Sequence, residues 1–179
     1  MSEPLMPATR PGNGPGAVTL SLPDAAATAQ VGAVIARALG ELAREVPVVV
    51  CLEGELGAGK TTLARGLLRA LGHAGRVPSP TYTLIEPYEL DGLPVHHLDL
   101  YRLADEEELL FLGASDWLDR PGLTLVEWPE RAPGLLARAD LRLMLALAGE
   151  GRSLTVHAAS VRMDAVVAAV TDALERDGT

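Results

Sequence analysis

The residues with the most evident chemical potential fall within a single octapeptide. Gly54-Glu55-Leu56-Gly57-Ala58-Gly59-Lys60-Thr61 matches the pattern G-x-x-x-x-G-K-[ST], in which glycines let backbone amides turn inward around phosphate oxygens. At this spacing Lys60 supplies positive charge to the β- and γ-phosphates, and the Thr61 hydroxyl is suited to ligate magnesium. Thr62, the next residue, would lie near the α-phosphate. The octapeptide therefore predicts a nucleotide-binding loop.

A phosphate-binding loop of this kind has a buried strand before it and a helix after it. Val46–Leu52 is an apolar run rich in β-branched residues, which is typical of a central strand covered on both faces, as in a parallel sheet. Thr61–Leu71 places leucines on one helical face, and Gly72 follows as a stop signal. This context favours a functional loop over a chance match or a structural glycine turn.

The nucleotide base is expected to be adenine, which makes ATP the predicted ligand. Many P-loop GTPases read guanine with an Asn-Lys-x-Asp motif, but Asn13 is the only asparagine here and Lys60 the only lysine among 15 basic residues. The lysine stands where a compact ammonium fits beneath a phosphate chain and a broad guanidinium fits poorly. A GTPase with a different base-reading loop remains an alternative.

Two carboxylates at the ends of apolar segments are candidates for handling metal and water. Asp99 ends Val95–Asp99, and Glu127 ends Leu123–Glu127. In this fold a second magnesium anchor comes from the carboxyl end of a neighbouring strand. Either carboxylate can hold the metal while the other orients the attacking water, and the sequence leaves the assignment open. Capping a helix or pairing with an arginine such as Arg102 is the structural alternative for each.

Other polar groups carry weaker signals. His96 and His97 point to opposite faces of an extended segment, and no Cys or third His is spaced to complete a zinc site. The segment Ser79–Tyr82 is either a switch that orders against the γ-phosphate or an ordinary proline-fixed turn. Asp105–Glu108 is predicted to be the solvated start of a helix. Cys51, the single cysteine, is predicted to be a small buried hydrophobe.

The chain is predicted to fold as one α/β domain of the P-loop NTPase type, with three layers and a mixed, mainly parallel central sheet. Asp91-Gly92 predicts an antiparallel hairpin. Residues 1–16, rich in Pro and Gly, are expected to form a disordered tail, which leaves residues 17–179 as the domain. The expected strands are Ala17–Leu22, Val46–Leu52, Thr81–Glu89, Leu93–Tyr101, Leu123–Trp128, Leu141–Ala148 and Ser153–Ala158, and the expected helices are Pro23–Leu39 with Asp24 as N-cap, Thr61–Leu71, Ala104–Leu112 and Met163–Leu174.

The overall charge bears on possible partners. A formal net charge of −9 repels a phosphate backbone, and unaided RNA binding would require clustered Lys and Arg. The longest apolar runs are far shorter than the roughly 20 residues that span a bilayer. We therefore expect a soluble, cytoplasmic protein that makes no membrane contact and does not bind RNA stably by itself.

Four segments taken together resemble the TsaE family, also called YjeE. They are Gly54–Thr62, Ser79–Leu84, His97–Arg102 and Val126–Glu130. The similarity runs from about Leu20 to Pro133. It implies a role in making threonylcarbamoyladenosine on tRNA, as an ATPase that uses ATP and magnesium, joins TsaD and TsaB, and meets tRNA only through that complex. Hydrolysis would then alter contacts with the partners and reset the complex between cycles.

The resemblance also implies roles for particular residues. By position, Lys60 is the phosphate lysine, and Thr61 and Glu127 are the magnesium ligands. Asp99 becomes an essential acid beside the metal, so that Lys60, Asp99 and Glu127 form the catalytic group. Thr81 corresponds to a switch residue.

Three further positions of the pattern are less defined. Thr28 is expected to border the adenine. Tyr82 and Trp128 fall within the matching motifs, but buried packing explains either aromatic equally well.

Two other functions are compatible with the same loop. A small-molecule kinase would need an acceptor pocket and usually an arginine-rich lid, and no compact segment of that kind stands out around Arg65, Arg69 and Arg76. A non-catalytic nucleotide sensor would use ATP to hold a partner-binding surface, with hydrolysis incidental.

Overall fold

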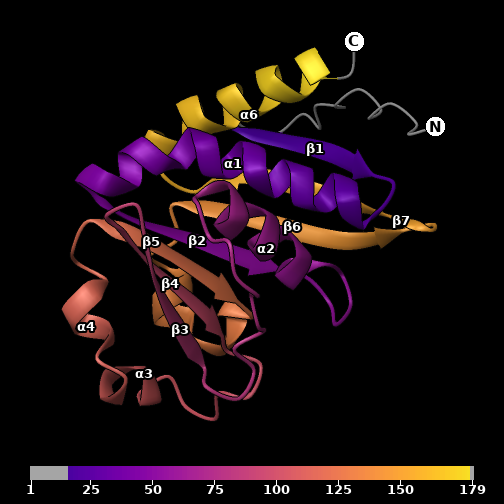
Figure 1. Ribbon diagram of the computed structural model, residues 1–179. Coiled ribbons are helices and arrows are strands. Elements are labelled where there is room, and N and C mark those ends of the chain that lie inside the picture. Colours follow the sequence, from indigo (N-terminus) through magenta and orange to yellow (C-terminus); the bar gives the residue numbers. More distant parts are fainter. Residues whose placement is uncertain (1–15, 178–179) are drawn as a thin grey trace.

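The computed structural model describes residues 16–177, whose strands form one seven-stranded sheet in the order β1-β7-β6-β2-β5-β4-β3 (Figure 1). The expected tail at residues 1–16 lies outside the described residues, apart from Gly16. The strands are β1 Ala17–Leu22, β2 Pro47–Glu53, β3 Ile85–Leu90, β4 Leu93–Asp99, β5 Gly122–Glu127, β6 Leu141–Ala148 and β7 Gly151–Ala158. Every predicted strand is present, and the largest change of boundary is the later start of β3.

Strand β2 lies at the centre of the sheet, with β5 and β6 as parallel neighbours on its two sides. Strand β4 pairs in parallel with β5. The three other pairings, β1–β7, β6–β7 and β3–β4, are antiparallel. The predicted mixed sheet is confirmed, but it is evenly mixed rather than mainly parallel. The tight turns at Asp91-Gly92 and Gly149-Glu150 permit only antiparallel neighbours, and β1 adds a further antiparallel strand beside β7.

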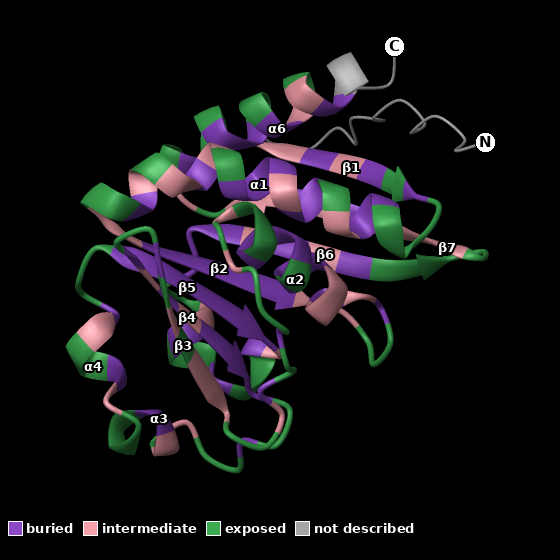
Figure 2. Cartoon of the chain, in the orientation of Figure 1, coloured by how far each residue is buried: buried purple, intermediate pink, exposed green. Residues whose placement is uncertain are grey.

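Apolar side chains alternate between the two faces of the sheet and build a core on each. In β2, Val48, Val50 and Leu52 belong to one core, whereas Val49 and Cys51 belong to the other. The first core is covered by α1 (Ala25–Glu45), α2 (Lys60–Ala70) and α6 (Asp164–Asp177), and the second by the short helices α3 (Glu108–Phe111), α4 (Ala114–Trp117) and α5 (Pro133–Leu136). Figure 2 shows the central strands buried along most of their length. The three-layer α/β arrangement is thereby confirmed.

Two glycines let α1 and α2 cross with their backbones in contact. A Cβ atom on Gly66 of α2 would lie 2.1 Å from the carbonyl oxygen of Ala29, and one on Gly32 of α1 would lie 2.4 Å from the carbonyl oxygen of Leu63. Backbone atoms cannot turn aside as a flexible side chain does, so larger residues would force the helices apart. The close crossing fixes the position of α2 and, with it, of Lys60 in its first turn.

Helix α1 begins as predicted but ends later. The Asp24 carboxylate accepts a hydrogen bond of 2.8 Å from the Ala27 amide, which confirms the predicted N-cap. The helix continues to Glu45 rather than ending near Leu39, because Ala43 still packs into the first core. Among residues 16–177, no helix combines the length and apolar character needed to cross a bilayer.

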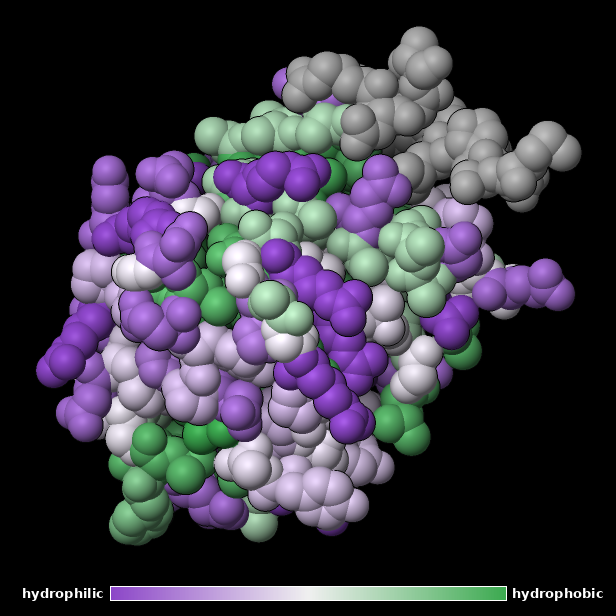
Figure 3. Space-filling view, in the orientation of Figure 1, coloured by the Kyte–Doolittle hydropathy of each residue, from purple (hydrophilic) through white to green (hydrophobic). Residues whose placement is uncertain are grey.

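Helix α3 is much shorter than the predicted helix over Ala104–Leu112. The Glu108 carboxylate accepts hydrogen bonds of 3.2 and 3.1 Å from the amides of Ala104 and Asp105, and the Asp105 carboxylate accepts one of 2.9 Å from the Glu107 amide. These local bonds from backbone amides to side chains stabilise turns in place of a regular helix before Glu108. Hydrophobic residues lie at the surface over α3, at the lower left of Figure 3.

The single cysteine is inert by position. Cys51 is fully buried, and burial, reinforced by the Glu53 carboxylate, raises the pKa of its thiol from 9.0 to about 12. Since the thiolate is the reactive form, we predict that a thiol reagent at about pH 8 labels native protein far more slowly than guanidinium-unfolded protein. The folded state also keeps a proton that the unfolded thiol loses above its ordinary pKa of 9.0, so the free energy of unfolding falls as the pH rises past that value. Timed labelling of native and unfolded protein measures the two labelling rates, and equal rates would contradict the prediction.

Candidate functional site

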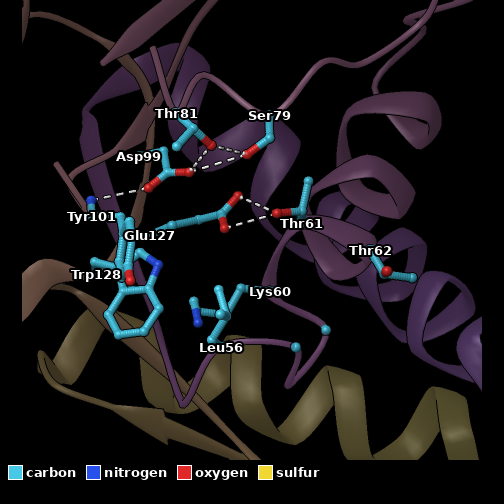
Figure 4. Close-up of a pocket in the computed structure, with 12 residues that line it drawn as sticks. Leu56, Lys60, Thr61, Thr62, Ser79, Thr81, Asp99, Tyr101, Glu127 and Trp128 are labelled. Carbon is cyan, nitrogen blue, oxygen red and sulfur yellow. Dashed lines mark hydrogen bonds between the residues drawn. The ribbon is translucent and has the colours of Figure 1, made fainter. Parts of the chain in front are cut away.

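The predicted phosphate-binding loop connects the end of β2 to the start of α2 (Figure 4). Gly54, Gly57 and Gly59 have φ angles of 141°, 79° and 108°, a region that residues with a Cβ rarely occupy. At Gly54 a Cβ would also lie 2.3 Å from the carbonyl oxygen of Leu145 in β6. The glycines are therefore required by the backbone path, which leads directly into the N-terminus of α2 at Lys60.

The ammonium group of Lys60 is enclosed by the loop and by an aromatic ring. Lys60 Nζ donates to the carbonyl oxygens of Gly54 and Glu55 at 2.6 and 2.9 Å, and it lies 3.9 Å from the centre of the Trp128 ring. Only 5% of the residue is exposed. Burial lowers the pKa of Lys60, while nearby carboxylates, Glu127 foremost, act in the opposite direction. An anion within reach of this ammonium would meet a charge that water screens only weakly.

Glu127 ends β5 and is held by a hydroxyl and an imidazole. Thr61 Oγ1 donates to Glu127 Oε1 and Oε2 at 3.1 and 2.9 Å, and His97 Nε2 lies 2.8 Å from Oε1. His97 and Glu127 are 0% and 2% exposed. Because a carboxylate only accepts, Nε2 carries the proton, and within residues 16–177 Nδ1 has no hydrogen-bond partner. The carboxylate is thus fixed beside the Thr61 hydroxyl, and oxygen atoms of this kind suit a hard divalent cation.

Asp99 ends β4 and stands next to Glu127 in the register of the two parallel strands. Its Oδ2 accepts hydrogen bonds from Ser79 Oγ at 3.1 Å and Thr81 Oγ1 at 2.9 Å, and its Oδ1 accepts one of 3.0 Å from the Tyr101 amide. The residue is 4% exposed. The hydroxyl-rich segment before β3 is therefore tied to a buried carboxylate at the edge of the site, as Figure 4 shows.

These groups surround one cavity of about 330 Å³ at the carboxyl ends of β2, β4 and β5, the edge where open α/β sheets bind ligands. Its lining comprises Leu56, Gly57, Gly59, Lys60, Thr61, Thr62, Ser79, Thr81, Asp99, Tyr101, Glu127 and Trp128. Three residues of the predicted binding set, Thr28, Glu55 and Ala58, do not line it, and Thr28 lies in a second cavity. The Glu55 side chain is exposed and Ala58 packs into the first core, so both take part in the loop only through their backbone.

A second cavity of about 170 Å³ adjoins the first, and the two share Gly57, Gly59 and Thr62. Thr28, predicted to border the base, lines this second cavity and is 2% exposed. Arg152 of β7 lines it as well, and its Nη2 donates to the Gly57 carbonyl oxygen at 3.3 Å. The sequence did not indicate Arg152, because nothing local connects the β6–β7 hairpin with the glycine-rich loop.

The aromatic residues of the motifs take different positions. Trp128 lines the first cavity, with its ring centre 4.9 Å from that of Tyr101 and a positive φ of 59°. The alternative that Tyr82 is buried packing is wrong, because the residue is 83% exposed and lies in a turn before β3. The guanidinium of Arg102 lies 4.5 Å from the centre of the Tyr82 ring. An aromatic surface is therefore presented next to the site.

The adjacent histidines diverge as predicted. His96 stacks on Trp117, with ring centres 4.4 Å apart, while His97 points to the opposite face and reaches Glu127. The sequence separates the two faces but does not show that a neighbouring strand brings Glu127 within hydrogen-bond distance of His97. The role of His97 was missed for that reason.

Comparison with known proteins adds an independent observation. The family model described as threonylcarbamoyl adenosine biosynthesis protein TsaE matches residues 22–154. The chain belongs to the TsaE family. The tRNA threonylcarbamoyladenosine biosynthesis protein TsaE of Haemophilus influenzae is 42% identical over 141 residues, which cover 79% of this chain and 89% of that protein. The protein of the same name from Synechocystis is 44% identical over 119 residues, covering 64% and 71% of the two chains.

A solved structure is similar to this chain in fold. The crystal structure of YdiB from Bacillus subtilis is similar with a TM-score of 0.66 at 25% identity, covering 94% of this chain and 100% of that chain. The TsaE match encloses every residue of the two cavities, from Asp24 to Arg152. The family match ends at residue 154, before helix α6. The structural likeness covers 94% of this chain and therefore extends farther along it.

Proposed function

We propose that this chain is a magnesium-dependent ATPase that serves threonylcarbamoyladenosine biosynthesis on tRNA, acting on a complex of TsaB and TsaD. The biosynthetic role follows the description of the family. The ATPase activity is inferred from one observation. A buried lysine and two buried carboxylates, Lys60, Asp99 and Glu127, line one cavity beside a glycine-rich loop. Phosphoryl transfer depends on positioned charges of this kind.

The loop and α2 provide the contacts for phosphates. The N-terminus of α2 carries a partial positive charge and free backbone amides. Lys60 Nζ, bonded to the carbonyl oxygens of Gly54 and Glu55, would exchange these neutral acceptors for charged phosphate oxygens, which form stronger hydrogen bonds. Thr62 bridges the two cavities and is placed for the α-phosphate.

Thr61 and Glu127 are the residues that would hold magnesium. The Thr61 hydroxyl lies 2.9 and 3.1 Å from the two carboxylate oxygens of Glu127, and oxygen ligands from one or two side chains plus phosphates are what this cation takes. When bound, the ion would supply neutralisation of the charge on the β- and γ-phosphates. We therefore propose Glu127 for the direct contact with the ion and Asp99 for the position beside it.

In this proposal, Asp99 and the hydroxyls bonded to it orient the attacking water. Hydrolysis forms a bond from the water oxygen to the γ-phosphorus and breaks the bond to the ADP oxygen, and its rate depends on in-line positioning. Ser79 Oγ and Thr81 Oγ1 lie 2.9 Å apart and share Asp99 Oδ2. A γ-phosphate that competes for these hydroxyls would move the segment that ends in exposed Tyr82, which gives a route from nucleotide state to surface.

The second cavity is assigned to the adenosine part of the nucleotide, with Thr28 and Arg152 at its wall. Because no arginine of the described part of the chain lines the first cavity, hydrolysis is favoured over a kinase reaction guided by an arginine lid. The net charge of −9 favours contact with tRNA through partners rather than directly.

The test is ATP hydrolysis by the purified protein, measured alone and with purified TsaB and TsaD at millimolar magnesium. We expect slow release of ADP and phosphate without any acceptor, and a changed rate in the complex. Calorimetry that detects no adenine-nucleotide affinity in well-folded protein would overturn the ATPase assignment. An unchanged rate together with no co-purification would overturn the partnership.

His97 provides a sharper prediction about the metal. Replacing His97 by Leu removes the donor to Glu127 Oε1, and we expect the magnesium affinity of the nucleotide complex to fall roughly 10–100-fold, the usual cost of losing a partner of a metal ligand. Nucleotide affinity without magnesium should stay close to wild type because Lys60 is untouched. His96→Leu is the matched control, since the adjacent His96 faces Trp117 instead. Nucleotide titrations across magnesium concentrations measure both variants, and identical metal dependence would refute the role.

A further inference from the structure

A cluster of exposed apolar side chains lies at the C-terminal end of α3, away from the nucleotide cavities. Leu110, Phe111 and Leu112 are 64%, 89% and 37% exposed, and we refer to these three residues as the α3 patch. Figure 3 shows hydrophobic residues gathered over α3 next to more hydrophilic neighbours. Contiguous apolar residues on the surface of a protein commonly mark an interaction site, whereas scattered ones need no explanation.

A groove of about 470 Å³ opens beside the α3 patch and includes Leu110 in its wall. Its floor is apolar, because Leu109, Leu118 and Leu135 line it and are themselves 5%, 8% and 3% exposed. None of the residues that line the groove also lines either nucleotide cavity. The groove is thus a separate recess with a hydrophobic base.

The rim of the groove is acidic. Among the residues that the structure describes, four carboxylates line it, Asp105, Glu106, Glu107 and Asp119, against one arginine, Arg138. That arginine is already paired with Asp119. Glu106 Oε1 accepts a hydrogen bond of 3.0 Å from a backbone amide of α5, whereas the exposed Glu107 side chain points its charge to the surface. A complementary ligand therefore carries positive charge at its edges and apolar side chains at its centre.

We propose that the α3 patch and its acidic groove dock a segment of a partner protein that presents apolar side chains flanked by arginine or lysine. Apolar anchors in a groove supply affinity, and the flanking charges supply register and association rate. Taken with the proposed function, on which this identification rests, the partner is the TsaB–TsaD complex. The α3 patch is also connected to the nucleotide site, because one loop leads from Asp99 at the end of β4 to α3.

The test compares two surface variants with nearly equal exposure. Phe111→Ser truncates the α3 patch, and Val161→Ser changes a residue that is 88% exposed in a different element, the 3-10 helix Val161–Met163. Affinity for purified TsaB–TsaD would be measured by biolayer interferometry with ATP and magnesium. We expect at least a tenfold loss for Phe111→Ser and wild-type affinity for Val161→Ser. Both variants should bind ATP like wild type in calorimetry.

A charge variant tests the acidic rim separately. Glu107→Lys should weaken binding at low salt and flatten the dependence of affinity on ionic strength, because a screened attraction has become a repulsion. Circular dichroism checks that both α3 variants are folded.

The outcomes separate this inference from the proposed function. If wild type binds TsaB–TsaD and Phe111→Ser binds equally well, the α3 docking surface is refuted while the partnership stands. If wild type does not bind the complex at all, both fail. Concentration-dependent dimerisation of the wild type that Phe111→Ser abolishes would identify a second copy as the occupant and also overturn the inference.

Discussion

Replacing Lys60 by Ala is expected to remove nearly all nucleotide affinity. Within residues 16–177, the ammonium is the one side-chain cation that lines the first cavity, and in the proposed complex it makes charge-assisted hydrogen bonds to two phosphate groups. Each such bond contributes about 1.5–3 kcal/mol, so losing two corresponds to a fall in affinity on the order of 100-fold or more. Calorimetric titration with ADP and with ATP at millimolar magnesium measures the change.

Two control variants separate the charge of Lys60 from its shape and position. Lys60→Arg keeps the charge, but the planar guanidinium does not fit between the Gly54 and Glu55 carbonyl oxygens beneath Trp128, so most of the affinity should still be lost. Arg69→Ala removes a positive charge from an exposed position of the same helix and should bind like wild type. Retained nucleotide affinity in Lys60→Ala would contradict the phosphate-binding interpretation of the loop.

Replacing Glu127 by Ala is expected to slow hydrolysis strongly while nucleotide binding persists. The variant keeps Lys60 and the loop amides, but it removes the carboxylate that holds Thr61 and would hold magnesium. Removing one electrostatic stabiliser of a transition state typically lowers kcat by about 10²–10³-fold. Single-turnover phosphate release measures the rate, and nucleotide retention on the protein measures binding. The contrast with Lys60→Ala, which should lose both properties, distinguishes catalysis from affinity.

Matched variants sharpen the comparison at Glu127. Glu127→Gln keeps the shape of the side chain and still accepts a hydrogen bond, so activity lost in this variant is due to the missing charge. Glu41→Ala removes a carboxylate whose side chain is 95% exposed on α1 and should hydrolyse ATP normally. Full threonylcarbamoyladenosine formation in cells that carry only Glu127→Ala would favour a nucleotide sensor over an ATPase.

The amino-acid sequence by itself determined the parts of the fold and the site whose signals are local. The strand β2, the loop and α2 follow one another within Pro47–Ala70, and each rests on a short-range property: an apolar run, glycines that allow positive φ, and a helical period of leucines. The Asp24 cap and the Asp91-Gly92 hairpin are local for the same reason. Proximity of Lys60 and Thr61 to the loop follows directly from their places in the chain.

Only the tertiary structure decided which distant residues meet. Alternation along a strand shows which face a side chain takes, but not which strand lies beside it or in what register. The neighbouring positions of Asp99 and Glu127 come from the β4–β5 register, and so does the contact of His97 with Glu127. Arg152 enters the second cavity because the β6–β7 hairpin packs beside β2. These pairings are long-range, since they depend on how buried faces match across the whole sheet rather than on any local pattern.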